Sequence, residues 1–296
     1  MGMNLGFVGL GIMGRPMALN LMRGGHAMAV YARRPESMKP LADAGAVTCA
    51  SPAEVAARAD ATFVMVSDTP DVEAVILGPG GCIEGARPGA VVVDMSTISP
   101  AATRRIAEAL AVKDIEMLDA PVSGGEVGAV NATLSIMVGG KAEVFDRVES
   151  LFELMGKNIV HIGASGAGQV AKSCNQIVAA VTIEAVAEAL LLAQANGVDA
   201  AKVREALLGG FAYSRVLELH GRRMLERDFK PGFKAALHQK DMRIVLQSAH
   251  ELGVALPAAA LAAQHINALV GSGEGDLDSS AIYRVLARMS REAGSD

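Results

Sequence analysis

Three glycines near the start of the chain have the spacing of a phosphate-binding turn. They lie between an apolar run typical of a strand, Leu5–Val8, and a helical pattern over Met13–Arg23. In such a turn the first glycine permits a tight bend, the second lets the backbone approach a pyrophosphate, and the third lets the helix pack against the strand. Free N–H groups at the helix start bind the anion. The pattern predicts a dinucleotide site at Gly9, Leu10, Gly11, Ile12, Met13 and Gly14, the alternative being a glycine-rich turn without a ligand.

The end of the second predicted strand, Ala27–Tyr31, indicates which dinucleotide is bound. An acidic residue there binds the ribose 2′-hydroxyl of NAD, whereas an arginine accommodates the 2′-phosphate of NADP. This chain has Arg33 and Arg34 and no carboxylate between Tyr31 and Arg34. We therefore expect NADP(H) to be preferred, with NAD(H) as the second cofactor. The alternative is that both arginines are solvated loop charges.

A nicotinamide supplies the hydride itself, so the protein must provide a proton donor and anchor the substrate. Lys172 is the best candidate donor because it lies near the start of a long helical segment, Gln169–Asn196. There the positive end of the helix dipole, and a neighbouring cation such as Lys240, favour loss of its proton. The ammonium would also stabilise a developing oxyanion. Asn175, at i+3, shares that helix face and would orient the substrate. The competing interpretations are a solvated lysine and an amide that packs between helices.

A Ser-Gly-Gly run follows another predicted strand. Ser123 offers a hydroxyl, and Gly124 and Gly125 leave their backbone N–H groups unobstructed. Such a concavity suits a carboxylate. By spacing alone, a plain turn explains the same residues equally well.

The titratable residues show no pattern typical of metal binding. The six histidines have neither an HExxH motif nor another paired-ligand spacing, so no metal is expected. Cys49, Cys82 and Cys174 are odd in number and far apart. This argues against a disulfide framework and for free thiols in a reducing cytoplasm.

Composition excludes several classes of partner. Aromatic residues make up 3% of the 296 residues, there is no Trp, and the net charge is −5. Nucleic acid would require stacking side chains or a basic surface, so it is not expected as a partner. No secretory signal is apparent at the N-terminus. The longest apolar stretch, Ile177–Val198, contains Glu184 and Glu188, which a bilayer centre penalises, so it is predicted to be a buried helix rather than a membrane span.

The elements that must position these residues change character along the chain. From Asn4 to His161, short β-branched runs alternate with helix-length segments. Such alternation predicts an α/β Rossmann domain with a doubly wound, mostly parallel sheet. After Gly163 the pattern is only helical. We predict a dinucleotide-binding domain over residues 1–163 and an all-α domain over residues 164–296, joined by a long helix.

The predicted joining helix is apolar on nearly every face. Roughly 28 residues at about 1.5 Å each span about 40 Å. Such a helix must be covered by the other domain, by sister helices or by a second subunit. A homo-oligomer, either a dimer or a tetramer, is therefore expected. Farther along, Gly271–Asp278 is expected to be an ordinary loop, and Arg222 and Arg223 a solvated face.

Five blocks, in order, resemble the β-hydroxyacid dehydrogenase (3-hydroxyisobutyrate dehydrogenase-like) family over essentially the whole chain. The blocks are Phe7–Leu21, Val66–Pro70, Asp94–Thr97 with Asp119–Gly125, Gly166–Asn175, and Phe229–Phe233 with His238–Asp241. The resemblance implies an NAD(P)-dependent enzyme whose substrate is a small carboxylated aldehyde or hydroxy acid. It also implies an active site between the two domains.

The resemblance assigns roles to individual residues. It places Lys172 and Asn175 on the catalytic helix, and it gives the Ser123–Gly125 run to the substrate carboxylate. Asp241 is expected to fix Lys240 or a helix end. Contacts to the cofactor are implied for Val66, Ser67, Asp68, Thr97, Phe233 and Lys240, of which Thr97 and Lys240 would also approach the substrate.

Within the family, three runs are most similar to 2-hydroxy-3-oxopropionate (tartronate semialdehyde) reductases. They are Met117–Glu126, Leu134–Gly140 and Leu208–Gly210. This similarity implies reduction of tartronate semialdehyde to glycerate. Alternatives within the family are a succinic semialdehyde or glyoxylate reductase and a 3-hydroxyisobutyrate dehydrogenase, and the alternative of another class is a non-catalytic dinucleotide-binding protein. The presence of Lys172 argues against the non-catalytic protein and against imine reduction, and the short helical domain argues against a 6-phosphogluconate dehydrogenase.

Overall fold

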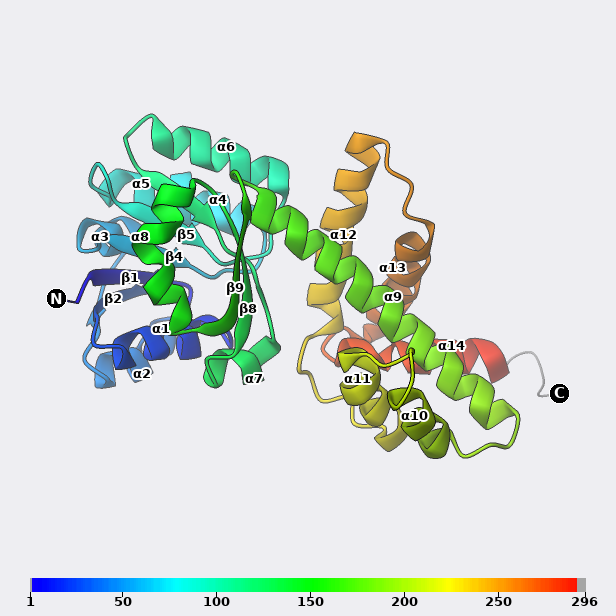
Figure 1. Cartoon of the computed structure of the whole chain (residues 1–296). Coiled ribbons are helices and arrows are strands. Elements are labelled where there is room, and N and C mark those ends of the chain that lie inside the picture. Colours follow the sequence, from blue (N-terminus) through cyan, green and yellow to red (C-terminus); the bar gives the residue numbers. More distant parts are fainter. Residues whose placement is uncertain (1, 292–296) are drawn as a thin grey trace. The chain divides into compact units, whose positions relative to one another are not determined.

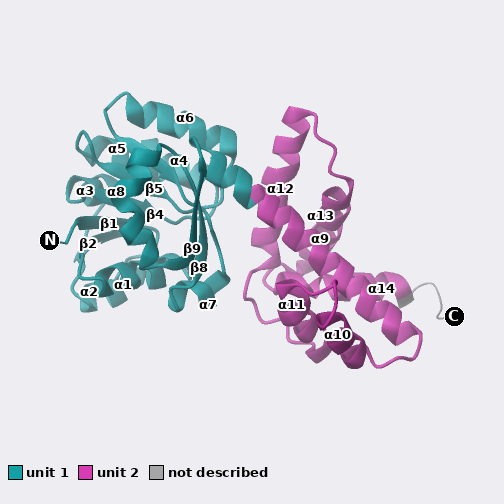
Figure 2. Cartoon of the chain, viewed as in Figure 1, with its two compact units in different colours: residues 1–172 teal, residues 173–296 magenta. Residues whose placement is uncertain are grey.

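The computed structural model describes residues 2–291 and divides into two compact units after Lys172. Figure 2 shows the α/β unit, residues 1–172, and the helical unit, residues 173–296. This confirms the predicted fold class. Helix α9, Ala167–Ala195, runs from the first unit into the second. The predicted domain boundary at residue 163 stays a prediction.

The described part of the α/β unit contains one sheet of nine strands, in the order β3-β2-β1-β4-β5-β6-β8-β7, with β9 beside β8. The pairs from β3 through β6 are parallel, whereas β8 runs antiparallel to β6 and β7. From β1 the chain adds β2 and β3 on one side of the sheet and β4, β5 and β6 on the other. The strand order therefore reverses between β1 and β4, and ligands bind at this point in such folds. The strands are β1 Asn4–Val8, β2 Ala27–Tyr31, β3 Val47–Thr48, β4 Ala61–Val64, β5 Val91–Asp94, β6 Glu116–Asp119, β7 Val122–Ser123, β8 Leu134–Gly139 and β9 Gly156–Gly163.

Side chains alternate between two cores, one on each face of the sheet. Phe7 and Phe63 stack in one core, with ring centroids 6.1 Å apart. Their neighbours Val8 and Val64 belong to the other. Helices therefore cover both faces, as a doubly wound sheet requires (Figure 1). The helices are α1 Gly14–Arg23, α2 Lys39–Asp43, α3 Pro52–Ala57, α4 Thr69–Leu77, α5 Cys82–Gly85, α6 Pro100–Ala111, α7 Gly125–Val130 and α8 Ala142–Glu153, with a 3-10 turn at Pro35–Ser37.

The helical unit packs around small and aliphatic residues of α9. Ala180, Ile183, Ala187 and Leu190 lie in its core, together with the fully buried Tyr283. Alanines at these positions let neighbouring helices approach closely, which compensates for the shortage of aromatic side chains. The other helices are α10 Ala200–Leu208, α11 Arg215–Glu226, α12 Ala235–Leu252, α13 Pro257–Leu269 and α14 Ile282–Arg291, with short turns at Val270–Glu274 and Ser279–Ala281.

Part of the α9 surface is not covered by this chain. Val178 and Leu192 are 66% and 67% exposed. By length and composition alone, α9 is also the one described helix suited to cross a membrane, but core helices of soluble proteins have the same properties. From Ala180 onward, its buried apolar residues belong to the core of the helical unit, so the predicted buried helix is buried on one side only.

Candidate active site

The glycine turn has the geometry that its spacing predicts. Gly9 has a φ of +96°, and a Cβ there would collide with the carbonyl oxygen of Met65. A Cβ at Gly14 would collide with the carbonyl oxygen of Gly9. At Gly11, by contrast, a Cβ would meet nothing within 4 Å. The fold requires the first and third glycines, whereas the second leaves the backbone open to an approaching pyrophosphate, so the turn fits a dinucleotide.

The two arginines after β2 have different surroundings. Arg33 Nη1 lies 3.4 Å from Asp71 Oδ1, on α4. Arg34 helps to line a cavity of about 500 Å³, together with Gly11, Ile12 and Arg15. Arg34 and the glycine turn therefore share one hollow of the α/β unit, where guanidinium groups suit a phosphate. Arg15 was not predicted as a cofactor contact, although its place in the first turn of the predicted helix indicates one.

The loops that follow β4 and β5 are bonded to each other. Ser96 Oγ accepts a hydrogen bond from the Val66 N–H at 3.0 Å, and the Ser96 N–H donates to Asp94 Oδ1 at 3.0 Å. Asp68 caps α4 by accepting from the Thr69 N–H at 2.7 Å. The predicted cofactor residues Val66, Ser67, Asp68 and Thr97 thus lie at the carboxyl ends of strands next to the switch point.

The Ser-Gly-Gly run connects β7 to α7. Gly124 and Gly125 have φ values of +138° and +61°, which disfavour any residue with a Cβ. Ser123 is half-buried and faces Ser135 in the register of β8. The conformation explains why glycine is used, and the assignment of this run to a substrate carboxylate stays a prediction.

The first turn of α9 is attached to the carboxyl ends of β5 and β6. Asp119 accepts hydrogen bonds from the N–H groups of Gly166, at 2.7 Å, and Gln169, at 2.9 Å. The Gln169 side chain accepts from the Ile98 N–H at 3.1 Å and donates to the Ser96 carbonyl at 2.8 Å. Burial raises the pKa of Asp119 to about 6, although the N–H donors oppose the shift.

Lys172 lies one helical turn after Gln169. Its residue surface is 7% exposed, which argues against a solvated surface lysine. Asn175 occupies the next turn of the same helix, and its Nδ2 donates to Gln176 Oε1 at 2.8 Å. The structure therefore places both predicted catalytic residues on one continuous helix whose start is fixed.

In the helical unit, Lys240 is fixed by a buried carboxylate. Lys240 Nζ lies 2.8 Å from Asp241 Oδ1, and Asp241 Oδ2 accepts from Gln176 Nε2 at 2.6 Å. This ion pair agrees with the expected role of Asp241.

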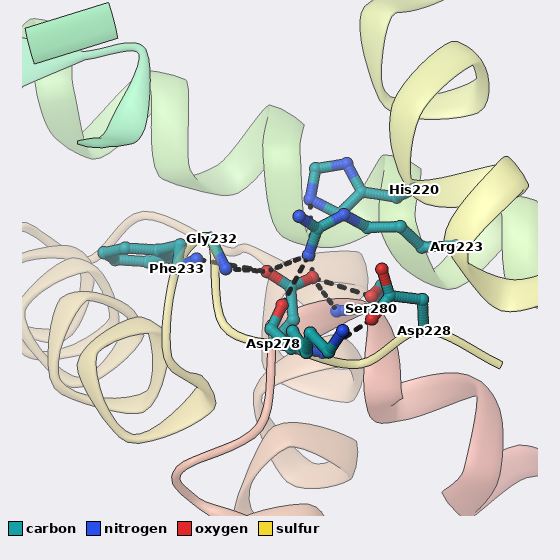
Figure 3. A network of polar contacts seen from close by, with 8 residues as sticks. His220, Arg223, Asp228, Gly232, Phe233, Asp278 and Ser280 are labelled. Carbon is teal, nitrogen blue, oxygen red and sulfur yellow. Dashed lines mark hydrogen bonds and ion pairs between the residues drawn. The ribbon is translucent and has the colours of Figure 1, made fainter. Parts of the chain in front are cut away.

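A second buried carboxylate, Asp278, holds the segment that contains Phe233 (Figure 3). Asp278 Oδ2 accepts from the N–H groups of Gly232, at 2.9 Å, and Phe233, at 3.0 Å. Arg223 Nη1 lies 3.1 Å from the same oxygen. The predictions that Asp278 belongs to an ordinary loop and that Arg223 lies on a solvated face are therefore wrong. In the sequence, Asp278 followed by two serines before a helix is a pattern typical of a helix cap.

Burial raises the pKa of Asp278, but the hydrogen bonds from Ser280 and from the Phe233 N–H outweigh it, so the net pKa is lowered. His220 Nε2 lies 3.8 Å from Asp278 Oδ1, and burial lowers the pKa of His220. At neutral pH the carboxylate is ionised and available to every donor around it.

Two family models match nearly the whole chain. The NAD binding domain of 6-phosphogluconate dehydrogenase matches residues 4–163, and the NAD-binding domain of NADP-dependent 3-hydroxyisobutyrate dehydrogenase matches residues 166–286. The 2-hydroxy-3-oxopropionate reductase of Escherichia coli is 50% identical over 97% of this chain and 98% of its own length. The chain belongs to the 3-hydroxyisobutyrate dehydrogenase-like β-hydroxyacid dehydrogenase family.

Two further members of this β-hydroxyacid dehydrogenase family match over nearly their full lengths. The 3-hydroxyisobutyrate dehydrogenase of Mycobacterium tuberculosis, solved with L-serine, is 33% identical with a TM-score of 0.89, covering 97% of this chain and 99% of that one. The NAD-dependent L-serine dehydrogenase of Pseudomonas aeruginosa is 35% identical over 95% of this chain and 97% of its own length. This β-hydroxyacid dehydrogenase is accordingly an NAD(P)-dependent enzyme that acts on small hydroxy acids.

Proposed function

We propose that the protein is an NADPH-preferring reductase of a small 3-oxo acid, with tartronate semialdehyde as substrate and glycerate as product. The 50% identity to a 2-hydroxy-3-oxopropionate reductase supports the substrate. The observation that carries the proposed chemistry is Lys172, buried one turn after the fixed start of α9.

Lys172 acts as the general acid in this proposal. A reduced nicotinamide, when bound, would supply a hydride to the aldehyde carbon. The Lys172 ammonium stabilises the negative charge that develops on the carbonyl oxygen, and its Nζ gives that oxygen the proton of the new hydroxyl group. Solvent then returns a proton to Lys172. Asn175 orients the carbonyl, and Ser123 with the glycines after it binds the carboxylate.

The preference for NADPH is supported by the chemistry around the glycine turn. Arg34 and Arg15 line the hollow next to Gly11, and the residues between β2 and Arg34 offer no carboxylate to a ribose hydroxyl. NAD(H) is the second cofactor in this proposal, because a relative named as NAD-dependent is 35% identical.

The test is a steady-state assay of NADPH oxidation with tartronate semialdehyde, succinic semialdehyde, glyoxylate and methylmalonate semialdehyde. Tartronate semialdehyde is expected to give the highest kcat/KM. Lys172→Ala should lower kcat about 100- to 10,000-fold, the range typical of a general acid, with the Kd for NADPH unchanged. Lys202→Ala, at an exposed lysine of α10, is the matched control and should retain wild-type turnover.

Other outcomes separate the alternatives. Near-wild-type turnover of Lys172→Ala would rule out the general acid. Preference for methylmalonate semialdehyde would favour a 3-hydroxyisobutyrate dehydrogenase, which the TM-score of 0.89 to such an enzyme makes the second candidate. Binding of NADPH without turnover of any aldehyde would favour the non-catalytic protein.

We also propose that the protein is a cytoplasmic homo-oligomer, a dimer or a tetramer. Free Cys49 and Cys82 are buried, as suits thiols in a reducing compartment. Val178, Ala185 and Leu192 are exposed on α9 at seven-residue intervals, the spacing with which one helix packs against another. A second copy of the chain would cover this stripe.

A further inference from the structure

We propose that Asp119 is a positioning residue for Lys172, acting through the first turn of α9. The inference rests on the proposed role of Lys172 as general acid. Asp119 does not itself exchange a proton with the substrate in this proposal. Its carboxylate fixes the helix start to the end of β6, and the helix fixes the lysine.

Asp119 attaches the helix through more than one backbone group. Its two oxygens each accept an N–H, one from Gly166 and one from Gln169, and the Gly168 N–H is a further donor. These are N–H groups of the first turn, which have no acceptor within the helix. The Asp119 carboxylate accepts hydrogen bonds from several of these N–H groups at once, and the positive end of the helix dipole stabilises its negative charge.

Two glycines allow the carboxylate to approach so closely. A Cβ at Gly168 would lie 2.6 Å from the Asp119 carbonyl oxygen, and one at Gly139, on β8, would lie 2.6 Å from Asp119 Oδ1. Both positions therefore exclude larger residues. The start of α9 therefore packs directly against the sheet at Asp119, with no space for the helix to move closer.

Gln169 provides a second attachment, to the neighbouring strand. It is fully buried, and its amide bridges the Ser96 carbonyl and the Ile98 N–H beyond β5. Lys172 lies three residues later, on the same side of the helix as Gln169. Two strand ends thus determine where the helix that carries Lys172 begins.

Charged side chains of two neighbouring elements, β5 and α6, lie near Asp119 and the residues it binds. Asp94, its partner in the β5 register, is buried, with Oδ1 held by the Ser96 N–H. On α6, the Arg104 guanidinium lies beside Gly166. Protonation of Asp119 would turn one of its acceptor oxygens into a donor. The hydrogen bond from one N–H of the first turn of α9 would then be lost.

The test is a double-mutant cycle on the aldehyde acid that the wild type reduces best. Asp119→Asn keeps one acceptor and presents an NH₂ group to a backbone N–H. It should lower kcat about 10- to 100-fold, as expected for a displaced catalytic group, with a smaller change in the KM for NADPH. In the Lys172→Ala background the same substitution should change kcat less than about threefold, because the group it positions is already gone.

The pH dependence of kcat separates positioning of Lys172 from a purely structural role, because a purely structural role would leave this dependence unchanged. Wild-type kcat should fall below pH about 6 as Asp119 becomes protonated, and Asp119→Asn should lose this dependence. Gln169→Leu, which leaves Asp119 intact, should lower kcat and keep the dependence. An undiminished effect of Asp119→Asn in the Lys172→Ala background would overturn the inference.

Glu54→Gln is the matched control, because Glu54 Oε2 also accepts a backbone N–H, that of Ala50, beside a helix start far along the chain from Lys172. It should leave kcat unchanged. Hydrogen exchange tests the attachment even if no aldehyde is reduced, an outcome that would reject the proposed function alone. Amides of residues 166–172 should exchange faster in Asp119→Asn, and unchanged exchange would overturn the inference.

Discussion

Arg33 and Arg34 are neighbours in sequence but contact different parts of the α/β unit. Arg33 is paired with Asp71 of α4, whereas Arg34 shares a hollow with the glycine turn. Both side chains are highly exposed, at 77% and 76%, so neither is needed for the fold. A charged side chain that does not stabilise the core is free to serve a ligand.

Replacing Arg33 and Arg34 together with Ala is expected to raise the Kd for NADPH about 100-fold and to leave the Kd for NADH nearly unchanged. Each guanidinium bond to a phosphate contributes about 1.5–3 kcal/mol, and about 1.4 kcal/mol corresponds to a factor of ten. Titration of cofactor fluorescence measures both constants. The double variant Arg87→Ala, Arg105→Ala, at two exposed ion-paired arginines, is the control. Equal weakening of both cofactors would contradict the preference for NADPH.

Individual site residues differ in how far the sequence reveals them. Gly9, Gly11 and Gly14 were predictable because their function depends on local spacing. The serines after Asp278 signal a local cap, but its distant donors were not predictable, because they come from two separate segments, at Arg223 and at Gly232–Phe233. Only the fold brings those donors to one carboxylate.

At the scale of elements, the longest helix was predicted, whereas several of the shortest elements were not. The expected helix Gln169–Asn196 is found at Ala167–Ala195. Strands β3 and β7, of two residues each, and helices α5 and α7, of four and six, were missed. Such elements contain too few residues to show a period, and tertiary contacts decide their conformation.

Asp278→Ala is expected to destabilise the helical unit by about 3–5 kcal/mol, the cost typical of leaving a buried ion pair and its donors without a partner. The side chain is 1% exposed and joins α11 to the segment before α12. Urea unfolding followed by circular dichroism measures the loss. Asp276→Ala is the matched control, because this nearby carboxylate is 89% exposed and pairs with Lys234 at the surface.

The difference between Asp278→Ala and the wild type should depend on pH. Since folding lowers the pKa of Asp278, its contribution is present above the ordinary aspartate pKa and is lost as the pH falls through the lowered value. A difference that stays constant on acidification, or equal stability of Asp278→Ala and Asp276→Ala, would contradict the role of this carboxylate.

At the scale of the whole molecule, charge is unevenly distributed. Residues 1–163 carry 13 Lys and Arg against 18 Asp and Glu, and residues 164–296 carry 14 of each, so the net charge of −5 lies on the nucleotide-binding half. An anionic cofactor is therefore not attracted by the overall field of that half. Local donors, namely the glycine turn with Arg15 and Arg34, must supply the attraction.

The exposed stripe of α9 predicts how copies of the chain associate. Val178 and Leu192 are two heptads apart, with the exposed Ala185 between them, and an apolar stripe of this kind is rarely left in water. The double substitution Val178→Lys, Leu192→Lys should reduce the mass measured by light scattering to that of a smaller assembly, because buried lysines would repel and lose hydration. Leu252→Lys, at a residue 75% exposed at the end of α12, should leave the mass unchanged. A monomeric wild type, or an unchanged mass of the double variant, would contradict an interface along α9.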